Sequence, residues 1–357
     1  MKSHIPELDL LRFGAAISVM LFHLAFRGAA ADGFSPLYYE PLAAPMKYGY
    51  LGVDLFFMIS GFVIMVSAQS GSIVNFISSR LSRLYPAFWI CCSITFCIIL
   101  LSETTLYPAK TSAWLFNMTM MPGSFGVPFL DGSYWSLGIE IKFYVLIACI
   151  IAIGQIQRAE WFMYAWLAAA VMNIAVPIPF LVSKLILTYA PCFIAGALFY
   201  FVRQKGSTPL RWTGIAVAWI LMLQRGVDMA GEQTAHYGVA HSAVVICFTL
   251  TAFFAMFTAI SLQKTGSLAK AKWPLLGALT YPLYLLHQTI GYIIFSKLHD
   301  ALNEHLLFWG TVALSFGAAY VVTLIEAPLI RTMRNGLSKI LEPVAKLAGL
   351  GTKVSPT

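Results

Sequence analysis

Apolar runs of about 20 residues recur along the chain, and they restrict its fold more than any other feature of the sequence. A run of this length crosses the hydrocarbon of a bilayer when it is helical. Hydrophobic residues make up 59% of the chain and charged residues 11%, with a mean hydropathy of +0.77. A soluble domain usually has about 25% charged residues. The sequence therefore predicts an all-α, polytopic membrane protein.

Ten apolar segments can be drawn, with ends defined to within a few residues. They run over residues 7–26, 50–68, 84–101, 135–153, 161–178, 185–202, 212–224, 241–262, 274–296 and 306–326. The seventh is short for a full crossing. Because no repeat or second domain is visible, we expect one transmembrane domain over 1–330 and a basic cytoplasmic tail over 331–357. The tail is partly amphipathic, and both a helix along the inner membrane surface and a solvated segment fit it.

The basic residues predict the orientation of these segments. The net charge is +8, and most Lys and Arg residues lie in short connections between apolar runs. With the N-terminus in the cytoplasm, 15 of the 23 fall inside, whereas Arg27 and Arg225 are among the six that fall outside. Both termini are then cytoplasmic. No basic patch is interleaved with stacking aromatic residues, so we expect no nucleic-acid partner.

Neither the cysteines nor the start of the chain suggests a further feature. The six cysteines lie inside apolar runs without metal-site spacing, so we interpret them as packing residues and expect no metal site. The first run carries Asp9, Arg12 and His23, whereas the apolar stretch of a cleavable signal is uncharged. We therefore expect this run to be retained as the first membrane span.

Arg12 and His23 share one helical face. They are eleven positions apart, which corresponds to three turns plus about 20° and an axial separation of about 16 Å. Ionisable residues inside a span cost several kcal/mol unless they are paired or face a cavity, which makes them candidate functional residues. In the predicted orientation Arg12 lies toward the cytoplasm and His23 toward the outer leaflet.

Two carboxylates lie at a depth similar to that of His23. Asp54 is about one turn below the outer end of the second segment, and Glu140 is one to two turns into the fourth. A carboxylate bound to one imidazole nitrogen fixes the tautomer and makes the other nitrogen a better base, so we expect Asp54 to orient His23. The alternative is that Asp54 only caps its helix. Gly52 and Gly61 permit a close helix approach.

Further ionisable residues lie in or beside later segments. His287 interrupts the ninth segment and Glu326 lies near the cytoplasmic side of the tenth, and a satisfied packing role remains open for His287. Arg80 and Arg83 are three apart and share a face if the stretch is helical. An arginine pair suits phosphate, because the guanidinium donates two parallel hydrogen bonds. From the sequence alone, ordinary anchoring at the inner surface explains these arginines better than a phosphate site does.

The motifs that contain these residues resemble those of the acyltransferase-3 family of integral membrane acyltransferases, which includes polysaccharide O-acetyltransferases. The matching motifs, in chain order, are "LDLLRFGAAISVMLFHL", "GVDLFFMISGF", "RLSRLYP", "YWSLGIEIKFY", "YPLYLLH" and "IEAP". They extend over residues 8–328, which is nearly the whole chain. Each motif alone is weak, whereas the set in this order is specific.

The resemblance implies a ten-helix acetyltransferase of the bacterial inner membrane. It would move an acyl group, usually acetyl, from cytoplasmic acyl-CoA to a hydroxyl of an external or membrane-linked glycan or glycolipid. Arg12 and His23 match the essential pair of the family, and Arg80 with Arg83 matches the motif associated with the CoA donor. The remaining matches are recurrent motif positions, namely Asp54, Trp135, Ser136, Glu140, His287 and Glu326.

These observations lead to one mechanism and one rival. In the mechanism Arg80, Arg83 and Arg12 place acetyl-CoA, and His23 acts as a general base or an acyl carrier toward the acceptor hydroxyl. Asp54 and Glu140 complete the predicted catalytic group. The rival is a proton-coupled transporter or flippase of a saccharide or small metabolite, in which the same intramembrane charges form a relay. The sequence leaves the oligomeric state open.

Overall fold

The computed structural model is all-α and describes residues 5–30, 33–104, 106–107 and 110–348. Among the described residues ten helices have 16 residues or more, and each corresponds to one predicted segment. These helices are α1 (Pro6–Phe22), α4 (Gly52–Ala68), α5 (Ile73–Ser102), α7 (Trp135–Ala152), α8 (Ala159–Ala175), α10 (Ala190–Lys205), α11 (Pro209–Tyr237), α12 (Ala243–Ser261), α13 (Pro274–Leu298) and α14 (Glu304–Leu347).

Short helices lie in the connections. The α-helical ones are α2 (Gly28–Ala30), α3 (Glu40–Met46), α6 (Thr111–Asn117) and α9 (Pro179–Lys184). A π-helical turn, η1 (His23–Arg27), continues α1 directly. The 3-10 turns are η2 (Gly49–Leu51), η3 (Pro122–Phe125), η4 (Gly132–Tyr134), η5 (Ile156–Arg158) and η6 (Gly266–Ala269).

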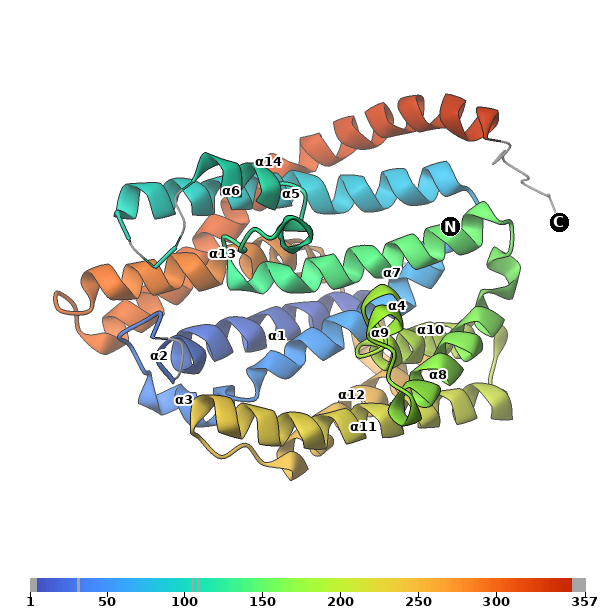
Figure 1. Cartoon of the computed structure of the whole chain (residues 1–357), viewed down its shortest axis with the longest axis horizontal. Coiled ribbons are helices and arrows are strands. Elements are labelled where there is room, and N and C mark those ends of the chain that lie inside the picture. Colours follow the sequence, from blue (N-terminus) through green and yellow to red (C-terminus); the bar gives the residue numbers. More distant parts are fainter. Residues whose placement is uncertain (1–4, 31–32, 105, 108–109, 349–357) are drawn as a thin grey trace.

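The helices form a bundle with two distinct ends (Figure 1). We call the end where α1 begins and α14 finishes the terminal end, and the end where α1 runs into α2 and α3 the loop end. Six helical stretches in the described part of the chain are long and apolar enough to cross a membrane. These stretches are Pro6–Ala30, Gly49–Ala68, Ile73–Ser102, Gly132–Ala152, Ala243–Ser261 and Glu304–Leu347. The chain is therefore a polytopic membrane protein, as predicted.

Two helices are longer than the apolar pattern indicated. α5 begins at Ile73 rather than near residue 84, and the hydroxyl of Ser72 accepts a hydrogen bond from the backbone N–H of Asn75 at its start (3.3 Å). Arg80 and Arg83 therefore lie within a helix, which confirms their common face. α11 continues to Tyr237 rather than 224, where Gly238 in the left-handed region ends it (φ 65°).

The extension of α11 corrects the placement of Arg225. This residue was assigned to an external connection, and the structure places it inside the helix. The prediction failed because polar residues in the second half of α11 interrupt the apolar pattern. α14 runs unbroken to Leu347, so the first part of the predicted tail is helical. The rest of the predicted tail, 349–357, lies outside the described residues.

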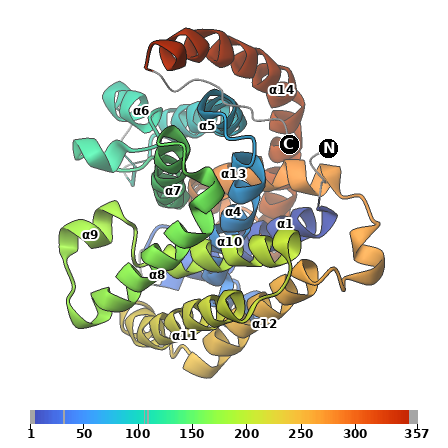
Figure 2. The ribbon, with the colours of Figure 1, turned by 90° about the vertical axis from the view of Figure 1, so that its right-hand side faces the viewer.

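α4 and α10 pack through glycine at the centre of the bundle (Figure 2). A Cβ added at Gly61 would lie 2.1 Å from the carbonyl oxygen of Phe193, and one added at Gly196 would lie 1.9 Å from that of Met58. Gly52 likewise faces the carbonyl oxygen of Ala15 on α1, at 2.7 Å from such a Cβ. The predicted close approach at Gly52 and Gly61 is confirmed, because only glycine lets these backbones meet.

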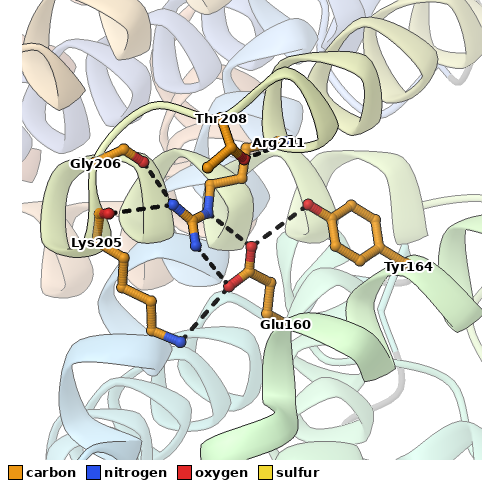
Figure 3. Close-up of polar contacts among 6 residues, drawn as sticks. All are labelled: Glu160, Tyr164, Lys205, Gly206, Thr208 and Arg211. Atoms are coloured by element: carbon orange, nitrogen blue, oxygen red, sulfur yellow. Dashed lines mark hydrogen bonds and ion pairs between the residues drawn. The ribbon is translucent and has the colours of Figure 1, made fainter.

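Charged groups join α8, α10 and α11 at the terminal end (Figure 3). Arg211 on α11 donates from Nε and Nη2 to both oxygens of Glu160 on α8, at 2.7 and 3.0 Å. Its Nη1 donates to the carbonyl oxygens of Lys205 and Gly206, at 3.3 and 2.6 Å, where α10 ends. One guanidinium thus satisfies carbonyl groups that the helix end leaves open and holds three helices together.

Substitution of Gly196 by Val should destabilise the protein by at least about 2 kcal/mol, because overpacking forces the α4 and α10 backbones apart. Denaturant unfolding in detergent measures the loss. Gly317→Ala on α14 is the matched control, since nothing lies within 4 Å of its added Cβ. Equal stability of the Gly196 variant and the wild type would contradict the packing described.

Candidate functional site

Two adjoining cavities lie inside the bundle. The arginine cavity has a volume of about 110 Å³ and its charged lining residues are Arg12, Arg80, Arg83 and Glu140. The histidine cavity has a volume of about 270 Å³ and its lining includes His23, Arg27, Asp54 and Arg225. Val53 and Tyr284 line both cavities, so the two spaces meet at these side chains. Each space is large enough for water or a small organic group.

Three guanidinium groups converge on the arginine cavity. Arg12 comes from α1, and Arg80 and Arg83 come from neighbouring turns of α5. Arg12 Nη1 lies 3.8 Å from Asp9 Oδ1, one turn earlier on α1. Asp9 in turn packs against Gly277 of α13, where an added Cβ would lie 2.8 Å from its Oδ1. Asp9 is thus the acidic neighbour of Arg12, held between α1 and α13.

Glu140 belongs to the arginine cavity rather than to the space around His23. Its Oε1 accepts hydrogen bonds from the hydroxyls of Ser60 (2.8 Å) and Tyr144 (2.5 Å). Glu140 was expected at a depth similar to that of His23, but the two side chains line different cavities. With three guanidinium groups and one carboxylate, the cavity carries an excess of positive charge. Such a lining suits a phosphorylated ligand.

His23 begins the π-helical turn at the end of α1. The backbone N–H of Gly28 donates to the carbonyl oxygen of His23, five residues earlier, which is the π-helical hydrogen bond. π-Helical turns inside α-helices occur frequently at functional sites. His23 is 5% exposed and His287 fully buried, and His23 Nδ1 lies 2.8 Å from His287 Nε2. His287 is therefore the side chain that orients His23.

The hydrogen bonds of this pair fix the tautomers of neutral rings. His287 Nδ1 lies 3.0 Å from the carbonyl oxygen of Leu283, and a carbonyl only accepts, so His287 carries its proton on Nδ1. His287 Nε2 must then accept from His23 Nδ1–H. The lone pair of His23 is left on Nε2, and Arg27 Nη1 lies 3.4 Å from that nitrogen. Because His23 and Arg27 both line the cavity, the result is an imidazole base beside a guanidinium.

The expected pairing of Asp54 with His23 is wrong. Asp54 Oδ1 accepts from Arg225 Nη1 at 2.7 Å and from Cys192 Sγ at 3.5 Å. The guanidinium of Arg225 also lies over the ring of Tyr189, 4.5 Å from its centre. A nearby guanidinium is a stronger partner for a carboxylate than a neutral imidazole is. Asp54 nevertheless lines the same cavity as His23.

The remaining motif positions divide between the two cavities, with one exception. Trp135 lines the histidine cavity. Ser136 lines the arginine cavity, and its hydroxyl lies 2.7 Å from that of Tyr284. Glu326 is buried on α14 and lines neither cavity. Within the described part of the chain no group of three or more His, Cys, Asp or Glu side chains is placed to hold a metal ion.

One face of α11 lines the histidine cavity, and none of its residues was predicted as a site residue. Arg225, Met229, Gln233 and Tyr237 line the cavity at a regular spacing of four residues. Residues with this spacing share a helical face, so the pattern itself was a usable signal. The predicted helix ended at residue 224, so Arg225 and the residues after it were not placed on a common face. Arg27, assigned to an external connection, also lies in helical structure at the cavity.

Comparisons with known proteins agree with the motif resemblance. Residues 5–325 match the family model described as an acyltransferase domain, of the acyltransferase 3 type. The chain is 28% identical over 171 residues to the putative peptidoglycan O-acetyltransferase YrhL of Bacillus subtilis, which covers 43% of this chain and 24% of that protein. It is 30% identical over 167 residues to the O-acetyltransferase OatA of Staphylococcus aureus, which covers 42% of this chain and 25% of that protein.

A third relative is similar to the same extent. The peptidoglycan O-acetyltransferase OatA of Listeria monocytogenes is 26% identical over 168 residues, which cover 41% of this chain and 24% of that protein. The aligned part thus spans about a quarter of the length of each of these relatives. No solved structure matches the chain.

Substitution of Arg225 by Gln should destabilise the protein by about 3 kcal/mol, because it leaves the carboxylate of Asp54 buried without its cation. Denaturant unfolding in detergent measures the change. The double variant Asp54→Asn/Arg225→Gln should recover most of the loss, since no charge is then left unpaired.

Lys205→Ala provides the comparison for this pair. Lys205 Nζ lies 3.6 Å from Glu160 Oε2, and its side chain is 47% exposed. A pair so open to solvent is worth at most about 1 kcal/mol. Equal losses for the Arg225 and Lys205 variants would show that Asp54 does not depend on Arg225.

Proposed function

This chain belongs to the acyltransferase 3 family, and from that membership and its two adjoining cavities we propose that it transfers an acetyl group from acetyl-CoA to a glycan hydroxyl. The observation that carries the proposal is the contact of a phosphate-compatible cavity with one that presents an imidazole base. The relatives named as O-acetyltransferases supply the choice of acetyl as the acyl group.

The arginine cavity receives the donor. Arg80 and Arg83 bind the phosphates of acetyl-CoA through paired guanidinium hydrogen bonds, and Arg12 helps to place the pantetheine arm. Glu140, held by Ser60 and Tyr144, keeps the guanidinium groups apart and oriented. The transporter alternative leaves this convergence of three arginines without a use.

The acetyl group reaches the second cavity where Val53 and Tyr284 line both spaces. Arg12 and His23 are eleven positions apart along α1 and its continuation η1, which is about 16 Å along the helix axis. The pantetheine arm is about as long as that separation. The thioester thus reaches His23 while the nucleotide stays at the terminal end.

His23 activates the acceptor. Its Nε2 accepts the proton of the acceptor hydroxyl as the new C–O bond forms, and the thiolate of CoA leaves and is protonated by His23. Arg27, 3.4 Å from that nitrogen, stabilises the negative charge that develops on the carbonyl oxygen. The same lone pair also serves a two-step route through an acyl-histidine.

The acceptor is a glycan or glycolipid at the external face. Aromatic side chains line the histidine cavity, among them Tyr50, Trp135, Tyr189 and Tyr237. The Asp54–Arg225 pair and Gln233 add donors and acceptors for sugar hydroxyls. The names of two relatives specify peptidoglycan, which belongs to the same chemical class.

The orientation follows from charge. We assign both termini to the cytoplasm of a bacterial inner membrane, with the terminal end inside and the loop end outside, because the bias of basic residues and an even number of spans favour this orientation. Arg27 and Arg225 lie in helical structure, so removing them from the external connections increases the excess of basic residues on the inner side. Acetyl-CoA then enters from the compartment in which it is made.

Substitution of His23 by Ala should lower acetyl transfer by about 10³-fold or more, because the base at the acceptor is lost. Purified protein in lipid nanodiscs with acetyl-CoA is assayed for thiol release and for acetylated glycan by mass spectrometry. His287→Gln should lower kcat by about 10²-fold through loss of the fixed tautomer. Transfer at the wild-type rate by the His23 variant would refute the assignment.

The double variant Arg80→Gln/Arg83→Gln should raise KM for acetyl-CoA by about tenfold or more, because charge-assisted hydrogen bonds contribute about 1.5–3 kcal/mol each. The control Arg331→Gln/Arg334→Gln removes an arginine pair of the same spacing from the exposed part of α14 and should leave KM unchanged. If both double variants raised KM equally, Arg80 and Arg83 would act only as general anchors and not as the phosphate site.

A further inference from the structure

Asp131 is a fully buried carboxylate that the mechanism above does not use. It lies immediately before η4, in the connection that leads into α7. A buried charge is costly unless its hydrogen bonds are satisfied, and such groups are often kept for position or chemistry. Its surroundings link it to the turn of α13 that carries His287.

Three hydrogen bonds satisfy this carboxylate. Asp131 Oδ1 accepts from the backbone N–H of Ser133 (2.8 Å) and from its hydroxyl (2.6 Å). Asp131 Oδ2 accepts from the backbone N–H of Thr289 at 2.8 Å. Thr289 lies two residues beyond His287 on α13. One oxygen thus orders its own turn, and the other binds the backbone beside His287.

The neighbours of Asp131 bind the same stretch of α13 from both sides of His287. The Ser133 hydroxyl also approaches the carbonyl oxygen of Tyr284 (3.2 Å), and the Tyr134 hydroxyl donates to that of Leu285 (3.2 Å). The Thr289 hydroxyl donates back to the carbonyl oxygen of Leu130 at 3.1 Å. These contacts, at residues 284, 285 and 289, hold α13 on both sides of His287 and so restrict the position of its ring.

Gly132 permits this close approach. A Cβ at this position would lie 2.5 Å from Gln288 Nε2, so a larger residue would push against the turn of α13. The segment 130–134 and residues 284–289 of α13 therefore form one packed junction, which we call the Asp131 junction. The junction fixes the position of His287, whose Nε2 accepts the 2.8 Å hydrogen bond from His23 Nδ1.

The Asp131 carboxylate lies beside the turn of α13 that carries His287, since its Oδ2 binds the backbone N–H of Thr289, two residues further along. All three groups that donate to its oxygens are uncharged. The charged and imidazole groups that share the histidine cavity with His23 are Arg27 from η1, Asp54 from α4, and Arg225 and His236 from α11, and Tyr284 of α13 lies against His287. From α5, the buried thiols of Cys91 and Cys92 belong to the same hydrophobic cluster as Tyr134 of η4 and Leu285 of α13. Asp54 and Arg225 form an ion pair with each other, whereas Arg27 lies beside His23 Nε2 and disfavours a positive charge on the ring pair.

We propose that Asp131 is a positioning residue for the His23–His287 pair, which fixes the turn that carries His287 and stabilises the positive charge formed there during transfer. This role rests on the proposed function. When His23 Nε2 takes the acceptor proton, the resulting positive charge is shared with His287 through their hydrogen bond and lies near the Asp131 carboxylate. The proton then passes from His23 to the departing thiolate, and the pair returns to its neutral state.

The test compares Asp131→Asn with wild-type protein in nanodiscs, with acetyl-CoA turnover measured from pH 5 to 9. The Asn variant should lower kcat by about 10-fold to 100-fold, with KM for acetyl-CoA within twofold of wild type. Without the negative charge, protonation of the ring pair becomes harder. The acid limb of the kcat profile should therefore move to lower pH by about half a unit or more.

Thr289→Val is the matched control. It removes the bond to the Leu130 carbonyl at the same junction but keeps the Asp131 charge and the Thr289 backbone N–H. Its acid limb should stay at the wild-type position even if stability falls. Asp131→Glu retains the charge and should likewise keep the limb near the wild-type pH.

Each outcome decides the proposal. An Asn variant with wild-type kcat and pH profile would overturn it, and so would a lower kcat with an unmoved acid limb, because that result describes a purely structural residue. If the Asn variant does not fold, an acid limb shifted to lower pH in the Glu variant would overturn it as well. Absence of acetyl-CoA turnover by the wild type would instead refute the proposed function.

Discussion

The close contact between α4 and α10 at Gly61 and Gly196 sets the centre of this bundle. Because backbone meets backbone there, α4 lies deep enough for its side chains to reach both cavities. Val53 lines the two spaces, Asp54 only the histidine cavity, and Ser60 only the arginine cavity. The site is therefore arranged around one buried helix whose position depends on the absence of side chains at glycine.

Low polarity around the site explains how its ionisable groups are combined. Three of its ionisable groups have partners at defined distances: Asp54 with Arg225, His23 with His287, and Glu140 with Ser60 and Tyr144. These pairings keep the positive excess in the arginine cavity and a neutral base in the histidine cavity. The phosphates of the donor are negatively charged and suit the positive arginine cavity. The acceptor hydroxyl instead requires a neutral base, which the histidine cavity holds.

The sequence predicted the helices well where the apolar pattern was continuous, and less well where polar residues face an internal cavity. The predicted segment ended before the end of α11, because polar residues such as Arg225 and Gln233 are typical of loops, whereas here they face a cavity inside the bundle. Helical geometry predicted correctly that Arg12 and His23 lie at different depths of one helix, and they line different cavities. Similar depth did not predict pairing, since Asp54 and Glu140 have other partners.

The sequence by itself determined the membrane class, the ten helical segments and the residue types available for chemistry, because these depend on local composition and on periodicity along one helix. Only the tertiary structure decided that His23 binds His287 rather than Asp54, and that Arg225 belongs to the site. Such choices depend on which faces of distant helices meet. That is decided by the close packing of α1, α4, α10 and α13, which no local pattern contains.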